Sequence, residues 1–222
     1  MITYPGVRVI PSTQVDWTET AHGRVKTLYE QARPSIRVTL EQWAPESSIR
    51  RGVPECWEEI FVSDGSLEGE PTYVLLSPNS TDQLRAGVRG CCLVRLSYDD
   101  SGEYAKTQLA CSYGEFLWQQ IPAREGNAPG SRTAELSRNQ SGSGVTTLLE
   151  AKAGWILAEH DHPVDAVSYC LRGGGILEVG GVQYPRVPNQ VALIPSGTRH
   201  SFRAGPEGTA LLIFVFAPGV IA

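Results

Sequence analysis

The chain has 222 residues, of which 41% are hydrophobic and 19% are charged, and its formal net charge is −5 at pH 7. This length accommodates one large domain or two small ones, and the apolar fraction is ample for a core, so the composition argues against intrinsic disorder. The acidic balance argues against a nucleic acid as the main partner, because phosphate binding requires a basic face.

Neither a membrane span nor an export signal is visible in the sequence. No run approaches the roughly 20 apolar residues of a spanning helix, and no basic segment followed by an apolar one occurs near the N-terminus. The cysteines are odd in number and scattered, which indicates free thiols in a reducing compartment: Cys56, Cys91, Cys92, Cys111 and Cys170. We therefore expect a cytoplasmic protein with no membrane partner.

Short apolar runs separated by turn residues recur along the whole chain. They predict strands over residues 36–40, 59–62, 73–76, 91–96, 146–150, 155–159, 167–171, 176–179, 191–194 and 210–216. Turns are expected where glycine and small polar residues gather: residues 64–65, 173–175, 180–181, 195–197 and 205–206. One helix is expected around residues 25–32, and an edge strand over 132–138 within the polar connection 123–144. This spacing is typical of an all-β sandwich or barrel.

The chain also resembles itself. Residues 38–40 align with residues 146–148 at an offset of 108 (Val38 to Thr146), and the same offset places Gly65 on Gly173. Further on the offset becomes 118, which places residues 77–79 on 195–197. Two copies of one β unit fit the length better than one large barrel. We therefore predict two domains, residues 1–110 and 111–222, whose terminal segments can cross over to complete the other domain.

Three of the four histidines have the spacing of metal ligands. His160 and His162 are two residues apart at the end of an apolar strand, so both rings are expected on one face, where they can chelate one divalent ion. His200 follows a Pro-Ser-Gly turn that starts another strand. The alternative interpretation is a set of surface or hydrogen-bonded histidines, which is what we expect of His22.

The spacing around these histidines resembles the signature of the cupin family. Its first motif, G-x5-H-x-H-x3-E-x6-G, and its second, G-x5-P-x-G-x2-H, are matched at Gly154, His160, His162, Gly173, Pro195, Gly197 and His200. Two positions depart from it, because Ala166 stands at the glutamate position and Asn189 at the opening glycine of the second motif. The resemblance implies an all-β fold of two cupin (double-stranded β-helix, or jelly-roll) barrels. It also implies one divalent metal ion held by His160, His162 and His200.

The first half resembles the cupin domain of ChrR-type anti-sigma factors, through residues 44–66, 73–81 and 90–94. There Gly52, Pro54 and Asp82 stand at the three histidine positions, and only Glu58 keeps its identity. Carboxylates without imidazole make a poor transition-metal site, so we interpret the first barrel as metal-free. The alternative is a hard-cation or ligand pocket around Glu58, Asp82 and Arg51.

Strand alternation predicts the walls of a substrate pocket beside the metal. The residues in phase with the ligands are Ile156, Ala158, Ser168, Cys170 and Phe202. Asp165, next to the missing glutamate, is expected to face away, with a carboxylate ligand as the alternative. Cys170 is expected to be a small wall residue rather than a thiolate near the metal.

The resemblance implies a metal-dependent cupin enzyme that acts on a small chelating organic substrate. A mononuclear Fe(II) dioxygenase is favoured, with zinc, nickel or manganese as the alternatives to iron. A non-redox isomerase, lyase or cyclase is the first alternative function, and a ligand-sensing regulatory cupin is the second. We expect a homodimer, because a metal-free barrel offers sheet edges for pairing.

Overall fold

The computed structural model describes residues 4–32, 35–49, 55–80, 83–99, 104–105, 110–122, 129–139 and 144–216. Within these residues the regular structure is β-strand, apart from two single 3-10 turns, η1 (Ser12–Gln14) and η2 (Tyr113–Glu115). The predicted all-β class is confirmed. None of the helical turns in this part of the chain is long and apolar enough to cross a membrane. The five cysteines are free, as predicted.

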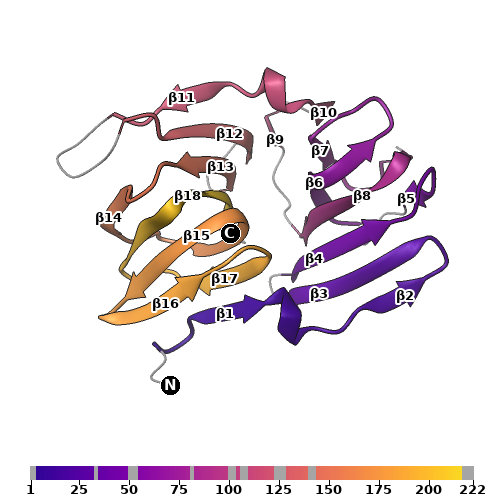
Figure 1. The fold of residues 1–222 in the computed structure, drawn as a ribbon. Coiled ribbons are helices and arrows are strands. Elements are labelled where there is room, and N and C mark those ends of the chain that lie inside the picture. The colour runs from indigo at the N-terminus through magenta and orange to yellow at the C-terminus, as the bar shows by residue number, and fades with distance from the viewer. Residues whose placement is uncertain are drawn as a thin grey trace. The chain divides into compact units, whose positions relative to one another are not determined.

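The strands form two compact units (Figure 1). The first unit contains β2 (Thr18–Thr20), β3 (Gly23–Ala32), β4 (Ser35–Trp43), β5 (Ser48–Ile49), β6 (Trp57–Leu67), β7 (Tyr73–Leu76), β8 (Leu84–Tyr98) and β10 (Ala110–Cys111). Their hydrogen-bonded order is β10-β7-β6-β8-β4-β3-β2, with β5 beside β8.

The second unit contains β1 (Arg8–Pro11), β9 (Tyr104–Ala105), β11 (Trp118–Gln120), β12 (Arg132–Asn139), β13 (Val145–Ala151), β14 (Ile156–His160), β15 (Asp165–Val179), β16 (Val182–Arg186), β17 (Gln190–Ile194) and β18 (His200–Phe216). The order is β1-β17-β15-β18-β13-β12-β11, with β14 beside β18, β16 beside β15 and β9 beside β12. Compared with the predicted domains 1–110 and 111–222, β1 and β9 lie in the second unit and η2 lies in the first.

The predicted helix over residues 25–32 is wrong. These residues belong to β3, which pairs with β2 on one side and with β4 on the other. β4 pairs with β3 from Gly23 to Ala32, and β2 pairs with its first three residues, so strand pairing overrides the local spacing of apolar residues that predicted a helix. The predicted strand over 132–138 exists as β12, but it is not an edge strand, because β11 pairs with its outer side.

Three of the predicted turns are also wrong, because they lie inside long strands. Residues 64–65, 173–175 and 205–206 belong to β6, β15 and β18. The register of β6 against β8 shifts between Val62 and Asp64 and again between Gly65 and Leu67, so these positions are β-bulges. Gly65 has φ +73°, a left-handed conformation that glycine adopts without strain. The glycine therefore bends a strand here and does not end it.

The two units repeat the same internal register. The two bulges of β6 recur in β15, between Cys170 and Arg172 and between Gly173 and Gly175, at the predicted offset of 108. At the same two offsets, the pair Ser48 and Arg85 of β5 and β8 corresponds to Ile156 and Arg203 of β14 and β18. The eight strands of the first unit therefore each have a counterpart in the second, whereas β9 and β16 of the second unit match none of the described strands of the first.

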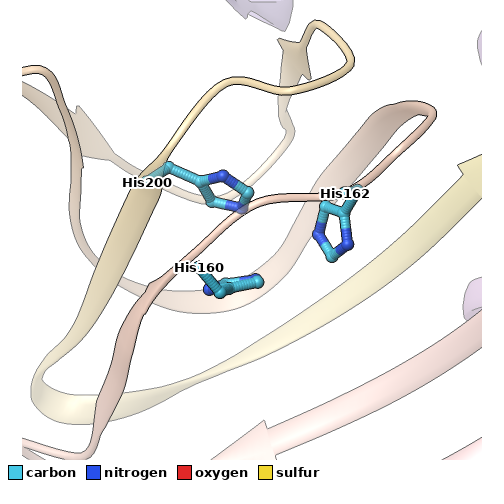
Figure 2. A group of neighbouring side chains, drawn as sticks. All are labelled: His160, His162 and His200. Carbon is cyan, nitrogen blue, oxygen red and sulfur yellow. The ribbon is translucent and has the colours of Figure 1, made fainter.

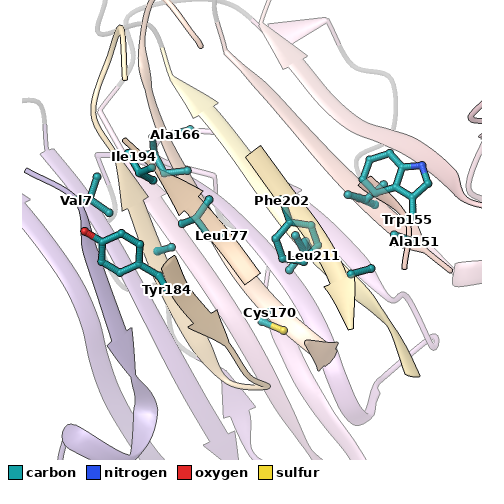
Figure 3. Close-up of a cluster of buried hydrophobic side chains, with 14 residues drawn as sticks. Val7, Ala151, Trp155, Ala166, Cys170, Leu177, Tyr184, Ile194, Phe202 and Leu211 are labelled. Atoms are coloured by element: carbon teal, nitrogen blue, oxygen red, sulfur yellow. The ribbon is translucent and has the colours of Figure 1, made fainter. Parts of the chain in front are cut away.

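Each unit has an apolar core of its own. In the second unit the core gathers residues from β13, β15, β16, β17 and β18 together with Trp155 and Val7 (Figure 3). Leu177, Phe202 and Leu211 are each at most 4% exposed. The first unit buries Ile60 and Leu93 completely, with Val74 and Leu76 beside them. Phe202 of β18 belongs to the core of the second unit, and Leu157 of β14 packs against it.

Candidate metal centre

The three predicted histidines lie together where β14 ends and β18 begins (Figure 2). His160, the last residue of β14, is the cross-strand partner of His200, the first residue of β18, and His162 follows in the connection to β15. The ring centroids are 4.3 Å apart for His160 and His200, 4.9 Å for His160 and His162, and 5.2 Å for His162 and His200. One ring nitrogen of each residue lies within 4.8 Å of the other two.

Two of the rings are oriented by backbone carbonyl groups. Nδ1 of His160 lies 2.9 Å from the carbonyl oxygen of Ala158, and Nδ1 of His200 lies 2.8 Å from that of Thr198. A carbonyl oxygen can only accept a hydrogen bond, so each contact places the imidazole proton on Nδ1. The lone pair then resides on Nε2, which is the arrangement in which a second hydrogen bond prepares an imidazole for a metal ion.

A set of hydrogen bonds joins the segment that carries His162 to the turn that precedes His200. The Gly197 N–H donates to the His162 carbonyl oxygen, the Ser196 N–H to Asp165 Oδ1, and the Ser196 hydroxyl to the Pro163 carbonyl oxygen, each over 2.8 Å. The turn is therefore tied to the loop at three points. This fixes how His162 and His200 lie relative to one another.

Asp165 belongs to this set of hydrogen bonds and not to the histidine cluster. Among the described residues, the grouping of three or more potential metal ligands contains His160, His162 and His200 alone. The alternative in which Asp165 supplies a carboxylate ligand finds no support in the geometry. Its carboxylate instead holds the turn that leads to His200.

Burial keeps two of the imidazoles, those of His162 and His200, neutral. It lowers the pKa of His162 to about 4, with further lowering from the neighbouring His160 and His200. Burial likewise lowers the pKa of His200, which is the most buried of the three. A neutral imidazole is the form that binds a metal ion, so neither of these two rings needs to lose a proton at neutral pH.

The alternation on which the predicted pocket residues depend is broken in β14, because this strand is bulged. Leu157 pairs with Phe202 and His160 pairs with His200, so β14 has one residue more than β18 over this stretch. The assumption of unbroken alternation is therefore wrong here: Ala158 is exposed and Ile156 is half-buried, whereas Leu157 packs against the core. Phe202 lies in that core (Figure 3).

Ser168 and Cys170 point into the interior of the second unit, where an arginine that the sequence analysis missed lies beside them. The guanidinium of Arg186, which is 3% exposed, donates to the Ser168 hydroxyl over 2.9 Å and to the side chain and carbonyl group of Gln190. Burial raises the pKa of the fully buried Cys170, which keeps it a neutral thiol. Arg186 is in phase with the inward-facing Tyr184, so strand periodicity could have predicted its direction.

In the first unit, Glu58 is completely buried and its carboxylate accepts a hydrogen bond from Arg95 Nη1 over 2.7 Å. The Glu58 carboxylate therefore forms a buried ion pair with an arginine of its own unit. The other residues of the alternative pocket and of the lost histidine positions, Arg51, Gly52, Pro54 and Asp82, lie outside the described residues.

Comparison with known proteins supports the fold. Residues 147–216 match the family profile described as the cupin domain. No curated protein sequence matches the chain.

Three solved structures illustrate the similarity in three dimensions. The chain is similar to the oxalate decarboxylase of Lactobacillus farciminis in its formate complex (TM-score 0.70, 9% identity, covering 97% of this chain and 88% of that one). It is also similar to AerE from Microcystis aeruginosa (TM-score 0.71, 9% identity, 94% and 98%). A cupin 2 conserved barrel domain protein from Leptotrichia buccalis gives a TM-score of 0.59 at 16% identity, over 95% and 96%. The predicted all-β fold of cupin-type barrels is thus confirmed.

Proposed function

We propose that the second unit binds one divalent metal ion through Nε2 of His160, His162 and His200. The observation that carries this proposal is the cluster itself: three neighbouring imidazoles, of which burial keeps those of His162 and His200 neutral. Nδ1 of His160 and Nδ1 of His200 are each directed to a carbonyl oxygen. Ligand nitrogens lie at about 2.0–2.1 Å from a zinc ion. The ring nitrogens lie within 4.8 Å of one another, and three nitrogens on one ion lie closer than that, so the rings must turn toward one another when the ion binds.

On this site we propose a metal-dependent enzyme that acts on a small chelating organic substrate, with an Fe(II) dioxygenase favoured. Three neutral ligands leave the charge of the ion uncompensated and its remaining coordination positions open, which favours an anionic substrate. When bound, the ion supplies Lewis-acid or redox chemistry at those positions. The residues of the chain orient the imidazoles and, through the apolar core that contains Phe202 and Leu177, keep water away from the reacting groups.

A non-redox lyase, isomerase or cyclase with zinc, nickel or manganese is the second candidate. The observation that favours it is the structural similarity to the oxalate decarboxylases of Lactobacillus farciminis and Bacillus subtilis. At 9% and 11% identity that similarity establishes a shared fold, and a shared type of reaction is proposed here on that basis. The ligand-sensing role is the third candidate and rests on the sequence resemblance of the first half.

Metal analysis of the purified protein tests the site, and oxygen consumption separates the candidates. Wild-type protein is expected to hold one metal ion per chain, and His162→Ala is expected to lose it while the strands remain folded. His22→Ala is the matched control, because His22 is an exposed histidine of the first unit. Equal metal content in both variants would contradict the proposal.

Iron together with substrate-dependent oxygen uptake would select the dioxygenase. Zinc, nickel or manganese with turnover but no oxygen uptake would select the non-redox enzyme. Metal content without turnover of any chelating carboxylate, enol or thiol would select the sensor. A homodimer remains part of the proposal, and light scattering that returned a monomer at micromolar concentration would contradict it.

A further inference from the structure

The interior of the first unit contains an ionic cluster on three adjacent strands. Arg95 of β8 lies between Glu41 of β4 and Glu58 of β6, and the three side chains are 3%, 5% and 0% exposed. The guanidinium donates from Nε and Nη2 to the two carboxylate oxygens of Glu41, over 2.9 and 3.0 Å, and from Nη1 to Glu58 Oε2 over 2.7 Å. All three guanidinium nitrogens of Arg95 thus donate to a carboxylate oxygen.

The carboxylate of Glu41 has a complete set of partners. In addition to Arg95, the Thr39 hydroxyl donates to Oε1 and the Trp43 indole N–H donates to Oε2, each over 2.8 Å. Burial alone lowers the pKa of Arg95, but the charges and hydrogen bonds of Glu41 and Glu58 raise it above its ordinary value. The cluster therefore holds two carboxylates around one permanent cation.

The repeat shows that the fold itself does not require this cluster. The register that pairs Glu41 with Leu93 corresponds to that of Leu149 with Leu211, and the register that pairs Glu58 with Ser97 corresponds to that of Ala166 with Val215. Arg95, opposite Thr39 and Ile60, corresponds in the same way to Ile213, opposite Thr147 and Ser168. The second unit thus has Leu149, Ala166 and Ile213 where the first has two acids and a base.

We propose that the interior of the first unit is a cation site, shaped for a planar guanidinium group and permanently filled by Arg95. Removal of this side chain would take away the cation that bridges Glu41 and Glu58, and the vacated space between the two carboxylates would then take up free guanidinium from solution. The contacts favour guanidinium over a metal ion, because the oxygens surround the cation at hydrogen-bond distance, 2.7–3.0 Å. Hard divalent ions require carboxylate oxygens at about 2.0–2.6 Å. The proposal is independent of the function proposed for the second unit.

Hydrogen exchange on the full chain tests the proposal, since it reports on β4, β6 and β8 separately from the second unit. In Arg95→Ala the backbone amides of these three strands are expected to lose protection from exchange, and the melting temperature of the first unit is expected to fall by about 10–20 °C. The reason is that removal of one partner of a buried ion pair leaves buried charge uncompensated. Guanidinium at tens of millimolar should restore at least half of the lost protection. Urea, which has the same planar shape without the charge, and sodium chloride should restore none.

Three further variants separate charge from shape and from general loss of stability. Arg37→Ala removes an arginine of β4 whose partner Glu30 is exposed, so it should change protection little and should not respond to guanidinium. Arg95→Ala combined with Glu41→Gln and Glu58→Gln should be better protected than Arg95→Ala alone and should not respond either. Arg95→Lys keeps the charge without the fork, so it should fold with intermediate protection even if Arg95→Ala does not fold.

Wild-type protection in Arg95→Ala or in Arg95→Lys would overturn the proposal. Equal rescue by urea would mean that the cation's charge is not what the site recognises, which also overturns it. Rescue by calcium or manganese at lower concentration than guanidinium would identify a metal site and would refute the assignment to guanidinium.

Discussion

Replacement of Asp165 by alanine should weaken metal binding without removing any ligand. The Asp165 carboxylate accepts the Ser196 N–H over 2.8 Å and is one of three hydrogen-bonded links between the loop of His162 and the turn before His200. The other two links remain in the variant. The perturbation is therefore confined to the relative position of two imidazoles.

The size of the effect follows from the kind of hydrogen bond that is lost. A hydrogen bond to a charged group contributes about 1.5–3 kcal/mol when buried, and less at this half-exposed position, so we take about 1–1.5 kcal/mol. If that energy holds the loop in its binding geometry, its loss raises the dissociation constant about 10-fold, within the range known for residues that orient metal ligands. Ser196→Ala removes only a neutral hydrogen bond and should raise it about 3-fold.

Competition with a chromophoric chelator, with Co²⁺ or Zn²⁺ as the probe, measures these constants. Glu178→Ala is the matched control, because this carboxylate of the same unit is exposed and accepts a hydrogen bond from the Gln183 side chain. Its dissociation constant should equal that of the wild type. An unchanged constant for Asp165→Ala, or an equal change for Glu178→Ala, would refute the argument that the turn positions the ligands.

Three further predictions concern stability. In metal-free protein the pKa of His162 is about 4 when folded and about 6.5 when unfolded, so the unfolded state binds the proton first. The free energy of unfolding should therefore fall as the pH decreases from about 6.5 to 4, by at most about 3 kcal/mol for this half-exposed ring. Urea unfolding should show a shallower decrease for His162→Gln, and an identical decrease would contradict the prediction. Phe202→Ala should cost about 3–5 kcal/mol in urea unfolding, because its ring fills the core of the second unit, and a cost below 1 kcal/mol would place the ring outside the core. Gly173→Ala should lower the free energy of unfolding by about 1–3 kcal/mol more than Gly181→Ala. Both glycines have positive φ, but of these two positions the new Cβ would meet a backbone oxygen at Gly173, at 2.1 Å. Equal thermal stability of the two variants would contradict this prediction.

The local patterns that predicted structure correctly share a physical basis. Apolar runs bounded by turn residues predicted nine strands or strand cores at the right places, because alternating burial fixes a strand wherever one face is covered. The offset of 108 residues aligned Gly65 with Gly173, and the structure has a β-bulge at both, because each glycine meets the close approach of a neighbouring strand. The spacing of His160, His162 and His200 predicted their cluster, because two ligands come from one short segment and the third follows a defined turn.

What the sequence by itself determined, then, is the class of fold, its internal repeat and the identity of the three clustered histidines. Tertiary structure alone decided the rest. The segment 25–32 became a strand because β4 pairs with it along its length, and Ala158 faces solvent because β14 bulges before His160. The partners of the histidine rings are backbone carbonyl groups, which no residue type encodes. Glu41, Glu58 and Arg95 are up to 54 residues apart along the chain, and only the pairing of β4, β6 and β8 brings their charges together.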